Sequence, residues 1–239
     1  MRFNKRLSPF KAISFDLDDN LYSNRPVMMA IEQKMIAYFA QILPQYEITF
    51  NHAFWSSFRC KVLKKQPSLM HDVVLSRMET YRLGLLKVGL QAQEASLYAQ
   101  NALAYFIECR SDFQVPKSSI ELLEKLSQKF PLVAISNGNV DTSKLGIEKY
   151  FSAVYHAGFQ ADGELWHQKP KTTMFDKACV HLGIQPNELL HVGDCGKSDV
   201  LGAFNAGCQT AWLSCYDVGQ PIKTLPHVEL TDINQLNLL

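Results

Sequence analysis

Two groups of aspartates in this chain have the spacing expected of a divalent-metal site. Asp16 and Asp18 lie two residues apart at the end of an apolar run, so their carboxylates start on the same side and repel one another unless a cation offsets them. Asp194 and Asp199 form a second group within the glycine-containing segment 193–199. Oxygen ligands from separate strand ends are typical of Mg²⁺. The four aspartates therefore predict a magnesium site.

The chain also supplies the donors and the positive charge that phosphoryl transfer requires. Ser136 offers a hydroxyl and Asn137 an amide, and Lys169 precedes a proline just before a predicted helix. The alternatives at these positions are structural. Asp16 and its neighbour are then a solvated acidic turn, Asp199 only a helix N-terminal residue, and Lys169 an ordinary surface lysine.

Three short apolar runs predict the buried parallel strands that would bring these groups together. They span residues 12–16, 132–138 and 189–194, and each ends on a polar side chain. Open parallel sheets bind their ligands at the carboxyl ends of strands, so three such endings favour one shared site. A further strand is predicted over 209–213.

Helical patterns separate the later strands and predict a doubly wound α/β sheet. A capping box at Ser118–Glu121 predicts one helix start. Thr172 or Thr173 is expected to cap a second helix, with Gly183 at its end. A third helix is expected to begin near Ser198 or Asp199 and to stop at Gly207.

Residues 23–112 have a different pattern, rich in apolar residues at helical spacing and poor in glycine. This predicts a helical insert directly after the first strand. The expected division is therefore a core made of 1–22 and 113–239, with a helical cap domain over 23–112.

The order of these motifs resembles the haloacid dehalogenase-like (HAD) superfamily. That order is D-x-D, then Ser-Asn, Lys-Pro and G-D-x-x-x-x-D, over some 180 residues. The resemblance implies a Rossmann-like core with a C1 cap. It implies Asp16 as nucleophile and metal ligand, and Asp18 as general acid and base with a metal-binding carbonyl.

The same resemblance assigns the remaining roles. Ser136, helped by Asn137, would bind the phosphoryl group, and Lys169 would steady the nucleophile and the charge of the phosphoenzyme. Asp194 and Asp199 would complete the Mg²⁺ site. Asp18 favours a phosphatase over a dehalogenase, because a departing halide needs no proton.

Asn20 departs from the family pattern, which has threonine at this position. We place Asn20 among the phosphate-binding residues, since its amide can hydrogen-bond locally. The departure keeps a second reading open, a degenerate HAD protein that binds a phosphorylated ligand with little turnover. Other HAD activities (mutase, phosphonatase, dehalogenase) form a third.

A finer resemblance is to the YigB branch of bacterial HAD phosphatases, carried by residues 15–26 and 132–139 and by Met1-Arg2-Phe3. That branch is linked to 5-amino-6-(5-phospho-D-ribitylamino)uracil in riboflavin synthesis and to flavin mononucleotide. It implies a small phosphorylated metabolite as the partner of this chain.

Composition agrees with a small-molecule enzyme. The 24 basic and 23 acidic residues leave a formal charge of +1, which gives no field to recruit nucleic acid or anionic lipid. No apolar run is long enough for a membrane span or a signal peptide. The six cysteines contain no C-x-x-C pair and predict free thiols in a reducing compartment. We therefore expect a cytoplasmic protein.

Overall fold

The computed structural model describes residues 1–161, 163–216 and 219–239. The chain divides into two compact units. The first combines Met1–Asn24, Gln114–Gly138 and Thr142–Leu239, and the second combines Arg25–Phe113 with Asn139–Asp141. We propose that the first unit is the catalytic core and that the second is the cap domain. None of the described helices is long and apolar enough to cross a membrane.

The first unit is built on a seven-stranded sheet with the order β1-β9-β8-β7-β2-β3-β4, in which only β1 is antiparallel to its neighbour. The strands are β1 (Arg2–Phe3), β2 (Ala12–Phe15), β3 (Leu132–Ser136), β4 (Ala153–His156), β7 (Leu189–Gly193), β8 (Gln209–Leu213) and β9 (Val228–Leu230). A hairpin of β5 (Gln160–Ala161) and β6 (Glu164–Leu165) lies apart from this sheet. This is the α/β, Rossmann-like fold that the sequence predicts.

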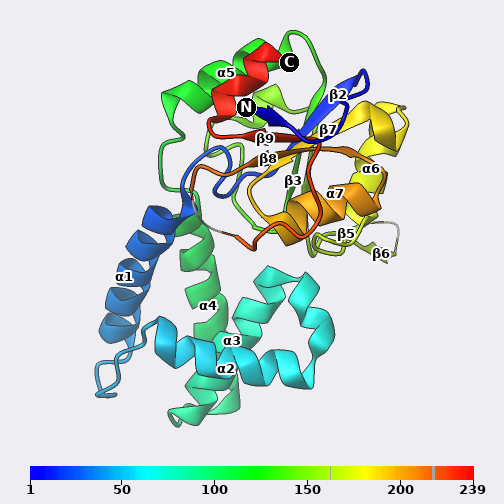
Figure 1. The fold of residues 1–239 in the computed structure, drawn as a ribbon. Helices are drawn as coiled ribbons and strands as arrows, with labels where there is room; N and C mark the ends of the chain where they lie inside the picture. Colours follow the sequence, from blue (N-terminus) through cyan, green and yellow to red (C-terminus); the bar gives the residue numbers. More distant parts are fainter. Residues whose placement is uncertain (162, 217–218) are drawn as a thin grey trace. The chain divides into compact units, whose positions relative to one another are not determined.

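Helices cover the two faces of the sheet (Figure 1). They are α5 (Lys117–Ser127) on one side and α6 (Thr173–Leu182) and α7 (Gly202–Asn205) on the other, with shorter turns η2 (Glu148–Tyr150), η3 (Pro186–Glu188), η4 (Gly196–Leu201, π-helical) and η5 (Ile233–Leu238). Met174, Phe175 and Ala178 of α6 pack in one fully buried cluster with Val133 and Ile135 of β3. Burial on both faces explains why the strands are continuous apolar runs.

The second unit is a helical bundle. It contains α1 (Asn24–Ile42), α2 (His52–Lys65), η1 (Pro67–His71), α3 (Val73–Lys87) and α4 (Ala92–Arg110). Its core centres on Phe39, which lies 4.9 Å from the Trp55 ring and 5.5 Å from the Tyr81 ring. Ring pairs at these separations add to the energy of burial.

The four predicted strands are confirmed within a residue or two, the predicted capping box is wrong, and one predicted helix start is shifted by two residues. The α5 helix begins at Lys117 after Pro116, so the proposed capping box lies inside its first turns, and the Ser119 hydroxyl instead donates to the Leu21 carbonyl at 2.6 Å. Pro116 is the residue before the helix, and its carbonyl accepts from the Ser119 and Ile120 backbone N–H groups, so the helix begins earlier than the box predicts. The helix expected at Ser198 begins at Gly196.

The end of α6 follows the expectation, since Gly183 adopts φ 64° and closes the helix in the left-handed conformation. Thr172 is the residue before the helix, but its side chain makes no capping hydrogen bond. At this helix the glycine therefore predicts the boundary better than the threonine does, because the left-handed backbone conformation at the helix end favours glycine.

Gly84 of α3 lies against the aromatic core, where a Cβ atom would stand 2.5 Å from the Trp55 ring. We expect Gly84→Ala to destabilise the helical unit by about 1–3 kcal/mol, because overpacking outweighs the gain in helix propensity of about 1 kcal/mol. Thermal unfolding measures the change. Lys87→Ala, on the exposed side of the same helix, is the control and should stay within about 0.5 kcal/mol of wild type; equal melting temperatures for both variants would contradict this packing.

Candidate active site

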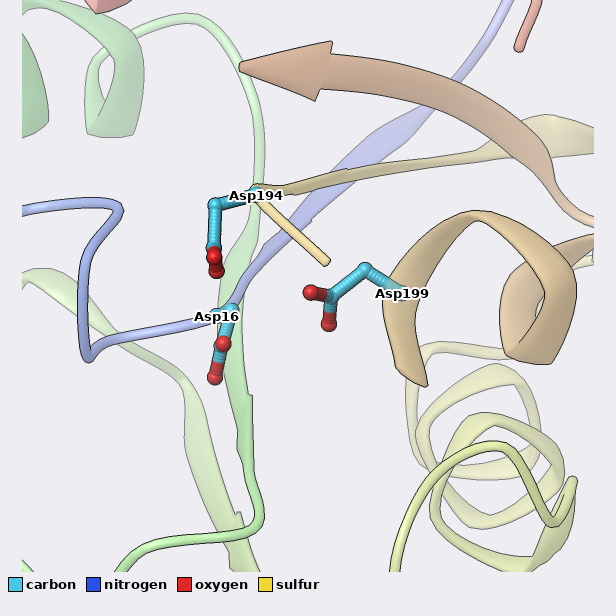
Figure 2. Close-up of side chains that lie close together, drawn as sticks. All are labelled: Asp16, Asp194 and Asp199. Atoms are coloured by element: carbon cyan, nitrogen blue, oxygen red, sulfur yellow. The ribbon is translucent and has the colours of Figure 1, made fainter. Parts of the chain in front are cut away.

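Three carboxylates meet at the carboxyl edge of the sheet. β2 and β7 are parallel neighbours, so Asp16 and Asp194, which follow their last residues, emerge side by side. Asp199 comes from the first turn of η4 and points at the other two (Figure 2). One oxygen of each carboxylate lies within 4.8 Å of the others. Repulsion among three anions at this distance has to be offset by cations or donors.

Gly193 makes room for the third carboxylate. A Cβ atom at this position would overlap the Asp199 side chain. Any residue other than glycine would therefore displace Asp199 from the group. The Asp199 carboxylate is 1% exposed, and its Oδ2 atom also accepts a 2.9 Å hydrogen bond from the Cys195 backbone N–H.

Lys169 is the cation inside this group. Its Nζ atom lies 2.9 Å from Asp16 Oδ1 and 2.5 Å from Asp199 Oδ1, and the residue is 2% exposed. Asn137 holds the lysine backbone from both sides, since its Oδ1 accepts from Lys169 N–H at 2.7 Å and its Nδ2 donates to the Lys169 carbonyl at 3.1 Å. The peptide bond from Lys169 to Pro170 is cis.

The pKa values record how crowded the group is. Burial raises the pKa of Asp16 to about 7, with Lys169 opposing and neighbouring carboxylates adding to the rise. Burial and the charges of the other two aspartates raise the pKa of Asp194 to about 8. Burial alone would also raise the pKa of Asp199, but the Lys169 ammonium and the His191 N–H hold it well below its usual range.

The pKa of Lys169 moves the other way. Burial lowers it, but Asp16 and Asp199 outweigh burial and raise it above the usual value, so the lysine stays charged. Three ionised carboxylates and one ammonium leave a formal charge of −2.

A divalent cation fits this donor set. All three converging ligands are carboxylate oxygens, the hard donors that Mg²⁺ prefers. Burial and mutual repulsion raise the pKa of two of them, and a divalent cation would offset that repulsion. Asp16, Asp194 and Asp199 would hold the ion, and it would supply the positive charge that lets an anionic nucleophile approach an anionic ester.

Asp18 is held separately from the three. Its Oδ1 atom accepts a 2.8 Å hydrogen bond from the Tyr22 hydroxyl. A Cβ atom on Gly138 would stand 2.6 Å from its Oδ2 atom, so the strand ends of β2 and β3 approach closely here. Ser136 Oγ accepts from Gly138 N–H at 3.0 Å, which leaves its own proton available to a ligand. Metal binding through the Asp18 carbonyl stays a prediction.

Asn20 ties the nucleophile loop to the sheet. Its Nδ2 atom donates to the carbonyls of Asp16 at 2.8 Å and Val192 at 3.2 Å, and the residue is 1% exposed. Its Oδ1 atom is buried without a hydrogen-bond partner. Both amide hydrogens are thus engaged by the backbone, so Asn20 does the loop-tying work. Direct contact of Asn20 with phosphate stays a prediction.

Sequence reasoning missed two side chains beneath the site. The first is His191, whose Nε2 atom lies 3.1 Å from Asp199 Oδ1. Trp212 donates from Nε1 to the Asp194 carbonyl at 2.6 Å. A polar His inside an otherwise apolar strand was the available signal for the first. The second depends on the pairing of β7 with β8, which no local pattern indicates.

Comparison with known protein families agrees with this arrangement of side chains. The model of the haloacid dehalogenase-like hydrolase family matches residues 10–207. The chain therefore belongs to this family of hydrolases.

Named relatives narrow the class. The chain is 34% identical to 5-amino-6-(5-phospho-D-ribitylamino)uracil phosphatase YigB of Escherichia coli, over 100% of both chains. It is 23% identical to the pyrimidine 5'-nucleotidase PynA of Streptococcus pneumoniae, over 95% of this chain and 93% of that protein. The crystal structure of a 2-haloacid dehalogenase from Pseudomonas syringae is similar with a TM-score of 0.85 and 26% identity, covering 96% and 97%. This protein is a phosphatase of the HAD family.

The raised pKa values predict how pH and Mg²⁺ act together. In the unfolded chain, the Asp16 and Asp194 carboxyls have pKa values near 3.8 and lose their protons above that pH. In the folded, metal-free protein they keep their protons up to about pH 7 and about pH 8. Stability without metal should therefore fall as the pH rises from about 4 to about 8. Mg²⁺ replaces those protons, so the gain in melting temperature on adding it should grow from about pH 5.5 to about pH 8.

Differential scanning fluorimetry with Mg²⁺ or EDTA measures this gain. Each kcal/mol of added stability corresponds to about 2–4 °C for a chain of this size. Asp194→Asn is the matched control: it removes one titrating ligand and should lose most of the Mg²⁺ gain at every pH. A gain that shrinks with rising pH would contradict the assignment of these carboxyls as ligands.

Proposed function

We propose that this phosphatase is a magnesium-dependent phosphomonoester hydrolase that works through an aspartyl-phosphate on Asp16. The observation that supports this most directly is the ion pair of Asp16 with Lys169 inside the three-carboxylate group. A carboxylate held between a fixed ammonium and a metal site can approach a phosphate dianion, which an isolated carboxylate would repel.

The two chemical steps follow from the side chains in hand. In the first, an Asp16 carboxylate oxygen attacks phosphorus, the ester P–O bond breaks, and Asp18 gives its proton to the leaving alkoxide. In the second, Asp18 takes a proton from water, the water oxygen attacks the same phosphorus, and the bond to Asp16 breaks to release inorganic phosphate. The Tyr22 hydroxyl keeps the Asp18 side chain in place through both steps.

Holding the phosphoryl oxygens falls to groups at the end of β3 and to Lys169. The Ser136 hydroxyl is free to donate, and Lys169 supplies a full positive charge. Asn137 contributes by fixing the lysine backbone, so its amide acts on the phosphate through Lys169.

For the substrate, we propose a small cytoplasmic metabolite with a phosphorylated side chain on a flat ring. 5-Amino-6-(5-phospho-D-ribitylamino)uracil, which the full-length E. coli relative dephosphorylates according to its name, is the first candidate, and flavin mononucleotide is the second. The pyrimidine nucleotidase relatives point to the same kind of ring. Nucleic acid and membranes have no part in this proposal.

The helical unit has a cavity of its own whose size and lining suit such a ring. The cavity has a volume of about 390 Å³, within the usual range for small-molecule pockets. Its lining is mainly aromatic and thioether side chains, with a few polar groups that include Arg77. The guanidinium carbon of Arg77 lies 3.6 Å from the Phe106 ring centroid. Such walls suit a flat, polarisable ring.

The similarity to a 2-haloacid dehalogenase structure favours a second candidate activity, carbon–halogen cleavage. Asp18 separates the two reactions, because only an alkoxide leaving group needs its proton. The third reading, a degenerate protein that binds without turnover, was motivated by Asn20; we propose that Asn20 instead supports catalysis by tying the nucleophile loop to two backbone carbonyls.

Replacement of the nucleophile tests the reaction class. Asp16→Asn should lower kcat for p-nitrophenyl phosphate by about 10⁴-fold or more, because the covalent route is lost. Acid quenching during turnover should trap labelled phosphate on the wild-type chain and none on the variant. Asp176→Asn, an exposed acid in the first turn of α6, is the control and should retain the wild-type rate. Turnover of 2-chloropropionate with no turnover of phosphomonoesters would favour the dehalogenase.

A substrate panel tests the ring preference. With Mg²⁺ present, the wild-type chain should hydrolyse the ribitylaminouracil phosphate and flavin mononucleotide with a kcat/KM at least about tenfold above that of glycerol 2-phosphate, since a few kcal/mol of ring burial are lost with the latter. Equal kcat/KM values across the panel would exclude a ring-specific enzyme.

A further inference from the structure

We infer that His191 is a positioning residue: it fixes the Asp199 carboxylate from below, so that Asp199 can serve Lys169 and a bound Mg²⁺ at the same time. This inference rests on the magnesium site proposed above. It concerns a side chain to which the reaction scheme gives no role, buried inside a strand.

The strand register places His191 under the site. Ser14 of β2 pairs with His191 of β7, one residue before the end of β2 and two residues before the end of β7. Side chains alternate along a strand, so Ser14 lies on the same face as Asp16, and His191 on the same face as Gly193. Asp199 occupies the space that Gly193 leaves open, directly above the imidazole.

The imidazole is held at both nitrogens. Nε2 lies 3.1 Å from Asp199 Oδ1, and Nδ1 lies 2.9 Å from the Ser14 hydroxyl oxygen. A carboxylate can only accept, so Nε2 carries the hydrogen and donates, and Nδ1 accepts from the Ser14 hydroxyl. Both residues are at most 1% exposed, so water does not compete for either nitrogen.

The Asp199 carboxylate then has three donors of its own. Lys169 and His191 donate to Oδ1, and the Cys195 backbone N–H donates to Oδ2. A carboxylate has about four acceptor positions. One acceptor position on Oδ2 remains for a metal ion, and the three donors fix the direction in which that lone pair points. Removal of the imidazole donor would free the carboxylate to rotate about Cβ–Cγ and would leave Lys169 as its only partner on Oδ1.

Groups that orient a metal ligand typically change metal affinity by about 10–100-fold when removed. His191→Leu should therefore raise the Kd for Mg²⁺ by about 10–100-fold. His191→Gln should largely restore it, because the glutamine amide can donate from near the Nε2 position. Ser14→Ala should give a smaller rise, since the ring keeps its donor but loses the partner that orients it.

Isothermal titration calorimetry with Mg²⁺ alone, on the full chain without substrate, measures these constants. Phe175→Leu is the packing control. The Phe175 ring meets the His191 ring edge-on at 4.9 Å, so this variant disturbs the same pocket and removes no donor. It should lower the melting temperature and leave the Kd for Mg²⁺ near the wild-type value. Equal Kd values for wild type and a folded His191→Leu would overturn the inference.

Two further outcomes keep the result decisive. If His191→Leu does not fold, Ser14→Ala decides, and an unchanged Kd in that variant overturns the inference. Imidazole ¹⁵N chemical shifts of the metal-free wild type provide a readout that does not depend on Mg²⁺. A hydrogen on Nε2 is expected, and one on Nδ1 overturns the inference. Loss of Mg²⁺ binding in the wild type itself would instead contradict the magnesium proposal.

Discussion

Charge compensation at one edge of the sheet is the constraint on which the rest of the site depends. Asp16, Asp194 and Asp199 lie too close together to be ionised in isolation, and the raised pKa values of the first two show the cost. Lys169 offsets part of that cost from inside the group. The remaining negative charge is what gives the site its proposed affinity for a divalent cation. Structural and catalytic requirements therefore coincide in the same ammonium group.

The parallel sheet is the element that holds these charged side chains close together. Neighbouring strands end at the same level, so side chains far apart in sequence arrive together without long or flexible connections. The buried apolar runs of β2, β3 and β7 anchor Asp16, Ser136 and Asp194 by a rigid backbone. Residues on loops would have to spend conformational entropy to hold the same arrangement.

Local sequence patterns predicted the strands, and the structure brings three of the four predicted acids together at their ends. A strand buried on both faces has to be a short apolar run, and Asp16, Ser136 and Asp194 stand at the ends of such runs. The role of His191 could not be predicted in this way. It follows from the register of β2 against β7 and from the space above Gly193, and both are properties of the folded sheet. The capping box predicted at Ser118 is wrong because the helix already begins at Lys117, with the Pro116 carbonyl accepting its first hydrogen bonds.

The contact between Gly193 and the Asp199 side chain suggests a way to recognise such sites in other chains. Gly193 and Asp199, six residues later, depend on one another sterically, since the Asp199 side chain fills the space that a side chain at position 193 would occupy. A motif of this kind records a packing solution first. Its persistence in a sequence would therefore testify to an intact acid cluster even where the catalytic activity had been lost.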